Sequence, residues 1–136
     1  MPKGDKALSS PHRLYPPRLR RLFYMMVVDI ARMSRMDLHL RLGEALLLLL
    51  ISAGTYEERP WTVSKAAIYL HEPRQTIDRL TRLLERRGLI VRERRGKAIF
   101  LRRAEAAAME RNPAYGAAFN RAVDRARTIL LEEDWG

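Results

Sequence analysis

The stretch of residues 73–101 reads PRQTIDRLTRLLERRGLIVRERRGKAIFL and carries the strongest structural signals in the chain. Its first half predicts a helix from Pro73 to Arg87, because proline suits the first turn of a helix and Gly88 suits a helix end. At about 100° per residue, the apolar positions of this helix fall on one side; they are Ile77, Leu80 and Leu84. The other side carries a glutamine and several arginines, so we expect one buried face and one cationic face.

Two short β-type runs follow the predicted helix. Residues 89–93 and 98–101 flank a turn that contains Gly96, which predicts a β-hairpin with basic residues at its tip. Before the helix, Thr62 is a suitable N-cap for a short helix over residues 63–70. A short helix, a turn, a second helix and a basic hairpin, in this order, are the parts of a winged helix-turn-helix.

The N-terminal regions predict an arm and two helices. Residues 1–16 are rich in proline, glycine and serine and have no apolar period, so we expect a flexible arm there. Residues 17–61 predict core and dimerisation helices, the first over residues 18–35. The second is expected to be capped by Asp37 and to end near Gly54, and its leucine content predicts a central buried helix.

Residues 104–136 predict a C-terminal helical dimerisation region. One or two helical turns are expected over residues 104–110, and an Asn-Pro pair at residues 112–113 predicts a last helix that runs to about Glu133. Residues 62–103 form the predicted winged helix-turn-helix. The predicted fold class is therefore mainly α with a small β-hairpin, a winged helix-turn-helix flanked by N- and C-terminal dimerisation helices.

Positive charge is concentrated in one segment. The chain has 26 basic and 16 acidic residues, which gives a net charge of +10. Residues 74–103 hold 11 basic and 3 acidic residues, whereas residues 1–73 hold 11 and 7, and residues 104–136 hold 4 and 6. A stretch of this kind predicts a surface that binds a polyanion such as DNA. For the helix within this segment, the alternative is an ordinary amphipathic surface helix with solvated arginines.

The exposed side chains of the predicted helix have the chemistry that reads base pairs. The major groove admits one α-helix, in which glutamine can pair with adenine and arginine with guanine. Thr76 suits a phosphate contact or a helix-start hydrogen bond, and Asp78 suits a cytosine or an arginine four residues away. The hairpin arginines and lysine are expected to reach phosphates or a minor groove. The predicted DNA-contacting residues are Arg74, Gln75, Thr76, Asp78, Arg79, Arg82 and Arg86 on the helix, and Arg92, Arg94, Arg95 and Lys97 on the hairpin.

The same segment resembles the recognition helix and wing of MarR-family transcriptional regulators. The matching residues are Pro73, Arg74, Thr76, Ile77, Leu84, Glu85, Gly88, Leu89 and Ile90. The close match covers residues 62–101, and it implies dimerisation through the terminal helices, near-palindromic operators and, often, a small aromatic effector. Two features depart from the family pattern: the wing lacks an Asp-x-Arg element, and His71 and Glu72 replace a turn glycine and an apolar residue.

The last predicted helix carries an apolar stripe at alternating spacings of three and four. Such a seam can pair with its symmetry mate, and we predict a homodimer, because a single reading helix covers too few bases for a specific operator. The alternative is that the helix folds back on its own core. The predicted dimerisation residues are Tyr115, Phe119, Ala122, Ala126, Ile129 and Leu130. For the effector, the candidate pocket residues between the first two helices are Tyr24, Met25, Met26, Met33, Met36 and His39, although methionine more often fills gaps in a core.

Several classes of protein are excluded by the sequence. There is no cysteine, so disulfides, thiolate metal sites and a cysteine nucleophile are excluded. No phosphate-binding glycine loop, nucleophile elbow or metal-spaced histidine set is present, so we expect no enzyme, metal or cofactor. The longest apolar run, residues 45–53, is shorter than the roughly 20 residues of a membrane span, and the N-terminus lacks a signal-peptide core. We expect a cytoplasmic, nucleoid-associated protein.

Together these features predict a sequence-specific regulator of transcription that binds double-stranded DNA. We expect a dimeric repressor that reads a palindromic operator through residues 73–87, with a basic wing at residues 92–97. Two alternatives remain: a winged-helix replication or partition protein of a plasmid or phage, and a winged helix used for protein–protein contact.

Overall fold

The computed structural model describes residues 15–104 and 112–132. In chain order, the elements are α2 (Pro17–Leu38), α3 (Leu42–Tyr56), β1 (Trp61–Thr62), α4 (Val63–Leu70), α5 (Arg74–Arg86), β2 (Ile90–Arg95), β3 (Ala98–Arg103) and α7 (Pro113–Glu132). The predicted arm over residues 1–16, apart from its last two residues, and the predicted helical turns over residues 104–110, apart from Ala104, lie outside the described residues.

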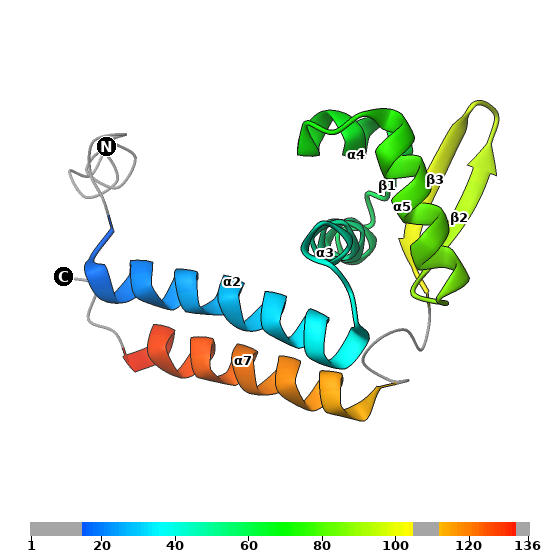
Figure 1. Cartoon of the computed structure of the whole chain (residues 1–136). Helices are drawn as coiled ribbons and strands as arrows, with labels where there is room; N and C mark the ends of the chain where they lie inside the picture. The colour runs from blue at the N-terminus through cyan, green and yellow to red at the C-terminus, as the bar shows by residue number, and fades with distance from the viewer. Residues whose placement is uncertain (1–14, 105–111, 133–136) are drawn as a thin grey trace, which may run out of the picture.

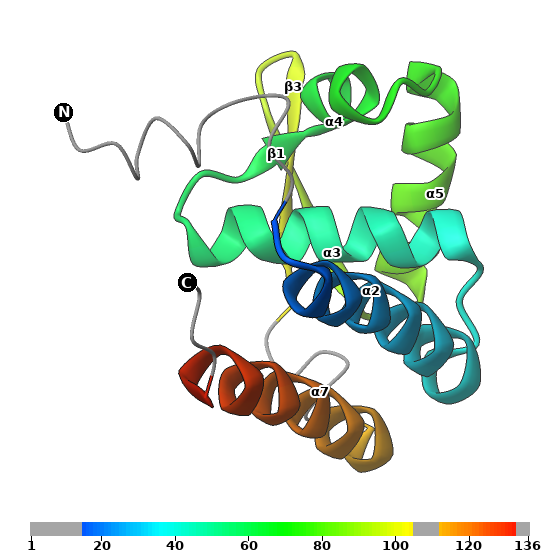
Figure 2. The same ribbon diagram turned by 90° about the vertical axis from the view of Figure 1, so that its left-hand side faces the viewer.

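Helix α3 lies at the centre of the molecule (Figure 1). On one side of it lie α4, α5 and the sheet, and on the other side α2 and α7 run antiparallel, next to each other. The second view shows the same two parts, with α3 between α4 and the pair of long helices (Figure 2). The helix-turn-helix and the hairpin therefore lie on the opposite side of α3 from the α2–α7 pair.

The core forms where α3 meets α5 and β3. The side chains of Leu47 and Ile51 on α3, Leu84 on α5 and Leu101 on β3 are fully buried. Burying an aliphatic side chain of this size contributes roughly 1.5–3 kcal/mol to folding, so this cluster fixes how α5 sits on the body of the protein. As the sequence predicted, the leucine-rich helix is the central element.

Three helix ends lie close to where the sequence placed them. Thr62 caps α4, since the Lys65 backbone N–H donates to its hydroxyl over 3.2 Å. Gly88 follows α5 with a φ of 74°, in the left-handed region that favours glycine. Asn112 caps α7 by accepting the Tyr115 N–H over 3.1 Å.

The boundary between α2 and α3 differs from the prediction. Helix α2 continues through Asp37 to Leu38 and ends where His39 takes a φ of 56°. Helix α3 begins only at Leu42, and Glu44 accepts the N–H of its N-cap residue Arg41 over 3.5 Å. The expected cap, Asp37, was wrong because three residues of turn separate the two helices.

The end of α2 is also bonded to the helix-turn-helix. The guanidinium of Arg87, directly after α5, donates to the backbone carbonyl of Leu38. The bond joins the last turn of α2 to the last turn of α5, although 49 residues separate the partners in sequence.

The predicted hairpin is part of a three-stranded antiparallel sheet of order β1-β3-β2. Strand β1 pairs Trp61 with Leu101 and Thr62 with Phe100, and β2 pairs with β3 along six residues. Strand β1 was not predicted from the sequence, because two residues are too few to show a strand period. Among the described residues no single helix is long and apolar enough to cross a membrane; α2 and α3 meet that test only as a pair bent by 106°.

The left-handed residue at the end of α4 yields a stability prediction. His71 is exposed and has a φ of 55°, a conformation that costs an L-residue with a Cβ roughly 1–2 kcal/mol. The substitution His71→Gly should therefore raise the free energy of unfolding by about 1 kcal/mol, measured by urea denaturation. As a control, His71→Ala keeps a Cβ and should bring no comparable gain. Equal shifts for both variants would assign the effect to the lost imidazole instead.

Candidate nucleic-acid interface

Helix α5 presents a polar face because its opposite face is held in the core. Ile77, Thr81 and Leu84 are buried to 1% exposure or less. Thr81 was not expected inside, and its hydroxyl is satisfied locally by donating to the Asp78 carbonyl over 2.9 Å. With this edge fixed, the remaining side chains point to solvent or along the two flanks of the helix. The predicted helix residues that are exposed are Arg74, Gln75, Arg79, Arg82 and Arg86, whereas Thr76 and Asp78 are half-buried.

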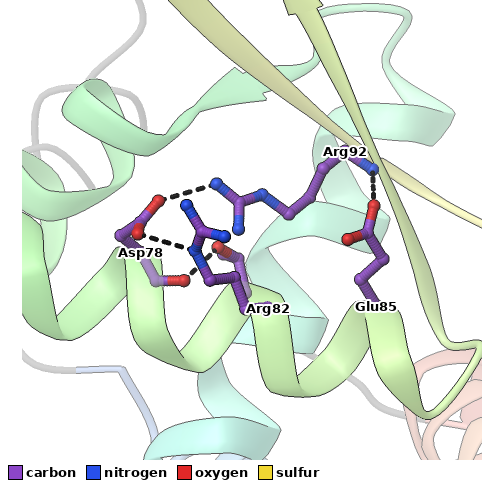
Figure 3. A network of polar contacts seen from close by, with 5 residues as sticks. Asp78, Arg82, Glu85 and Arg92 are labelled. Carbon is purple, nitrogen blue, oxygen red and sulfur yellow. Dashed lines mark hydrogen bonds and ion pairs between the residues drawn. The ribbon is translucent and has the colours of Figure 1, made fainter.

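The carboxylate of Asp78 faces two arginines (Figure 3). Its Oδ2 accepts from Arg82 Nε over 2.9 Å, and its Oδ1 accepts from the Arg92 guanidinium over 2.6 Å. The hydrogen bond from Arg82 has the largest effect and lowers the pKa of Asp78 below its ordinary value of 3.8; burial opposes it, and the charge and hydrogen bond of Arg92 lower the pKa further. The carboxylate is thus ionised at neutral pH, and its prediction as an ion-pair partner of Arg82 is confirmed.

Arg92 joins the wing to α5. Its side chain is only 9% exposed, and its backbone N–H donates to Glu85 Oε2 on α5 over 3.2 Å. Arg92 was expected to reach a phosphate, but its guanidinium binds Asp78 instead. We therefore assign Arg92 a positioning role: it holds β2 against α5. Arg82, by contrast, keeps 62% of its side chain exposed while bound to the same carboxylate.

The wing carries the other predicted cations at its tip. Arg95 binds Glu93 over 3.0 Å, lies over the ring of Phe100 at 5.1 Å, and remains 61% exposed. Arg94 and Lys97 are exposed on either side of Gly96, whose φ of 62° allows the tight turn. The hairpin therefore presents three cationic side chains to solvent next to the polar face of α5.

One basic residue of this surface was missed from the sequence. Arg102 lies on β3, pairs with Glu93 over 3.3 Å, and is 49% exposed. The predicted second strand stopped at Leu101, whereas β3 continues to Arg103 and places Arg102 opposite Val91. Arg102 would have been included only if the second strand had been predicted to continue past Leu101. There was little reason to extend that strand, because arginine by itself does not favour a strand.

The stripe predicted to pair two subunits is largely used within one chain. Tyr115, Ala122 and Ala126 are at most 8% exposed, and α7 packs along α2 with an ion pair between Arg125 and Asp29 at 3.2 Å. Burial also raises the pKa of Tyr115. Phe119 and Ile129 are half-buried, and only Leu130 is open, at 46% exposure. The three buried residues are covered within the chain itself, as the alternative of folding back on its own core expects.

The methionine pocket predicted between the first two helices does not form as expected. Tyr24, Met25, Met36 and His39 are exposed and Met33 is buried. Met33 and Met36 instead line a cavity of about 570 Å³ between α2 and α7. A smaller and more apolar cavity of about 210 Å³ lies between α3 and α7, near the end of β3.

Comparison with known proteins gives matches among solved structures. No protein-family model matches the sequence, and no curated protein sequence matches it. The structure is similar to MepR of Staphylococcus aureus, a transcription regulator of the efflux pump MepA, with a TM-score of 0.56, 16% identity, and coverage of 85% of this chain and 81% of MepR. A MepR variant bound to an oligodeoxyribonucleotide has a TM-score of 0.58 and 17% identity, with coverage of 85% of this chain and 80% of the variant. A MarR-family transcriptional regulator from Rhodococcus sp. RHA1 has a TM-score of 0.51 and 21% identity, with coverage of 84% of this chain and 77% of the regulator.

The chain has the fold of the MarR-family regulators. In this MarR-like fold, α4 and α5 are the helix-turn-helix and the β2–β3 hairpin is the wing, so the predicted winged helix-turn-helix is confirmed. The identities are too low to extend the likeness beyond the fold, and the function must be argued from the surface itself.

The Asp78–Arg92 contact can be tested by stability measurements. Arg92→Met should lower the free energy of unfolding at pH 7 by about 1–2 kcal/mol, because it removes a mostly buried, charge-assisted hydrogen bond. Arg94→Met is the matched control: it removes the same charge from an exposed position and should change stability little. The pKa of Asp78 is lowered on folding, so its contribution is present above pH 3.8 and is lost as the pH falls through the lowered pKa. The difference in free energy of unfolding between Arg92→Met and wild type should therefore shrink as the pH falls through that range. A difference that stays constant with pH would contradict the ion pair.

Proposed function

We propose that the chain is a sequence-specific regulator of transcription that binds double-stranded DNA, acting in the cytoplasm at the nucleoid. The observation that carries the proposal is the outer face of α5, where Gln75, Arg79, Arg82 and Arg86 are exposed beside a basic wing. The inner face of the same helix is buried, so these side chains project from a rigid support. An α-helix of this kind fits the major groove, which is about 12 Å wide.

Each part of the surface has a role that follows from its chemistry. Arg79 and Arg82 are placed to donate to guanine, and Gln75 to pair with adenine. Arg74, Thr76 and Arg86 lie at the ends and flank of the helix and contact phosphates. The exposed wing residues Arg94, Arg95 and Lys97 neutralise phosphates or enter a minor groove, which gives affinity without sequence preference.

The regulator acts as a homodimer that represses by occupying a palindromic operator. Helix α2 exposes large apolar side chains, among them Phe23, Tyr24, Val27 and Val28, each at least 49% exposed. Helix α7 adds exposed Leu130 and Leu131. Exposed apolar side chains of this size on two long helices support a protein interface, and a two-fold dimer would place two reading helices one DNA turn apart.

The experiment that tests the proposal is selection of bound duplexes from a random pool by the purified full chain. We expect a pseudo-palindrome with two half-sites about 10 base pairs apart. Binding measured by fluorescence anisotropy should weaken steeply with salt. Enrichment of no sequence, with equal affinity for duplex DNA and heparin, would reject sequence-specific regulation in favour of general polyanion binding.

Substitutions should separate base reading from phosphate binding. On the selected operator, Arg79→Ala and Arg82→Ala should each cost about 1–3 kcal/mol of binding free energy and relax the sequence preference. Arg95→Ala and Lys97→Ala should weaken binding to operator and random DNA by the same factor. Anisotropy titrations on both duplexes provide the measurement, and equal losses on both for the α5 variants would refute the base-reading assignment.

The dimer face can be tested on α2. Val27→Asp places a charge in the exposed apolar face and should shift the protein from dimer to monomer in light scattering coupled to size-exclusion chromatography. Ile68→Asp is a matched control, because Ile68 is 76% exposed but lies on α4, away from α2. A monomer for the wild type, or dissociation by both variants, would exclude dimerisation through α2.

We also propose that the protein binds a small aromatic effector, and the cavity of about 210 Å³ between α3 and α7 suits such a ligand. Its walls include Tyr56, Tyr115 and Phe119 together with Arg103, so it offers aromatic contacts and a cation for an aromatic carboxylate. Benzoate should raise the unfolding temperature of the wild type, and it should do so less for Phe119→Ala. No shift in either protein would remove the effector from the proposal.

A further inference from the structure

Glu44 is a buried carboxylate whose pairing is incomplete. Its side chain is 7% exposed, and one oxygen, Oε1, accepts the Arg41 backbone N–H at the start of α3. The other oxygen, Oε2, is buried and has no hydrogen-bond partner among the described residues. A buried carboxylate oxygen without a donor is costly, so a donor that can reach it is stabilised there.

The unpaired carboxylate lies next to the reading helix. Glu44 lines a cavity of about 420 Å³ between the first turn of α3 and one flank of α5. The α5 residues that line the same cavity are Arg79, Leu80 and Leu83. Arg79 is exposed, and within the part of the chain that the structure describes, no hydrogen bond or ion pair joins its guanidinium to another group. A buried carboxylate without a donor and a cation without an acceptor therefore border one hollow.

We infer that the Arg79 guanidinium, which is unpaired among the described residues, moves across the shared cavity onto Glu44 Oε2 in the DNA-free protein, and that it must leave Glu44 to bind DNA. This inference rests on the proposed function, and it concerns regulation of the same surface. A guanidinium presents two parallel N–H donors, which match a carboxylate with a free oxygen. DNA and Glu44 then compete for one side chain, and Glu44 acts as a positioning residue that lowers the affinity of the free protein for DNA.

Arg41 is the other cation on the cavity wall, so it is the alternative partner for Glu44. It caps α3, and its backbone N–H already holds Glu44 Oε1. Its guanidinium starts from the same end of α3 as the carboxylate, whereas Arg79 reaches the cavity from α5, on the opposite wall. The two arginines can be distinguished by substitution, because only one of them belongs to the reading face.

The test is a double-mutant cycle on affinity for the selected operator, using wild type, Glu44→Gln, Arg79→Gln and the double variant. Glutamine also accepts the N-cap amide, so Glu44→Gln keeps the start of α3. We expect Glu44→Gln to lower the operator Kd by about two- to five-fold, as for a partly exposed ion pair, and to have no effect when Arg79 is already Gln. Tighter binding in both backgrounds would mean a general gain of positive charge and would overturn the inference.

As a matched control, the effect of Glu44→Gln on operator affinity is also measured in an Arg41→Gln background. The effect of Glu44→Gln should persist in that background; if it disappears there and remains in Arg79→Gln, then Arg41 is the partner and the inference is wrong.

A second measurement needs no DNA and separates this inference from the proposed function. Urea midpoints of the same four proteins should be non-additive, because either single substitution removes the same ion pair. Additive midpoints would overturn the inference even if the operator is bound. Failure of the wild type to bind any duplex would reject the proposed function, while non-additive midpoints would still support the Glu44–Arg79 pair.

Discussion

The fixed inner edge of α5 is the constraint on which the other features depend. Ile77, Thr81 and Leu84 are buried against α3 and the hairpin, so the helix can neither rotate nor slide without exposing them. A one-residue rotation, about 100°, would bring Arg82 inward and Leu84 outward. The burial of three side chains therefore determines which arginines are open to a ligand.

The few acidic residues of the basic segment organise its arginines. Asp78 holds Arg82 and Arg92, and Glu93 holds Arg95 and Arg102. Each of these two carboxylates thus pairs with two arginines. The surface stays strongly positive, but the paired arginine side chains are restricted in the directions they can take. Restricted side chains lose less conformational entropy when they bind, which favours specific over diffuse contact with a polyanion.

Much of the fold was predictable because its elements carry strong periodic signals. Residues 62–101 combine a cap, an apolar face, a glycine stop and a glycine turn, and each local signal agrees with the others. Strand β1 was not predictable, since two residues show no period. The end of α2 was not either, because Asp37 is an acceptable cap and only the turn at His39 decides against it.

The candidate site was predictable as a set of residues but not as a set of roles. Helical spacing alone relates Asp78 to Arg82, four residues away, whereas the Asp78–Arg92 contact spans 14 residues and depends on how the wing folds onto α5. For α7, an apolar stripe looks the same whether it packs on a second subunit or on the chain's own α2. Sequence therefore identified the stripe at Tyr115 and Ala122 but could not choose its partner.

The contact between Arg87 and the Leu38 carbonyl has a geometric consequence. It fastens the last turn of α2 to the last turn of α5, close to the short connection between α2 and α3. In a dimer built on α2, the separation of the two reading helices would be set at this junction and not within α5. The length of the spacer between half-sites would then report the angle between the long helix pair and the winged helix, and a change in that angle would alter which spacer the protein accepts.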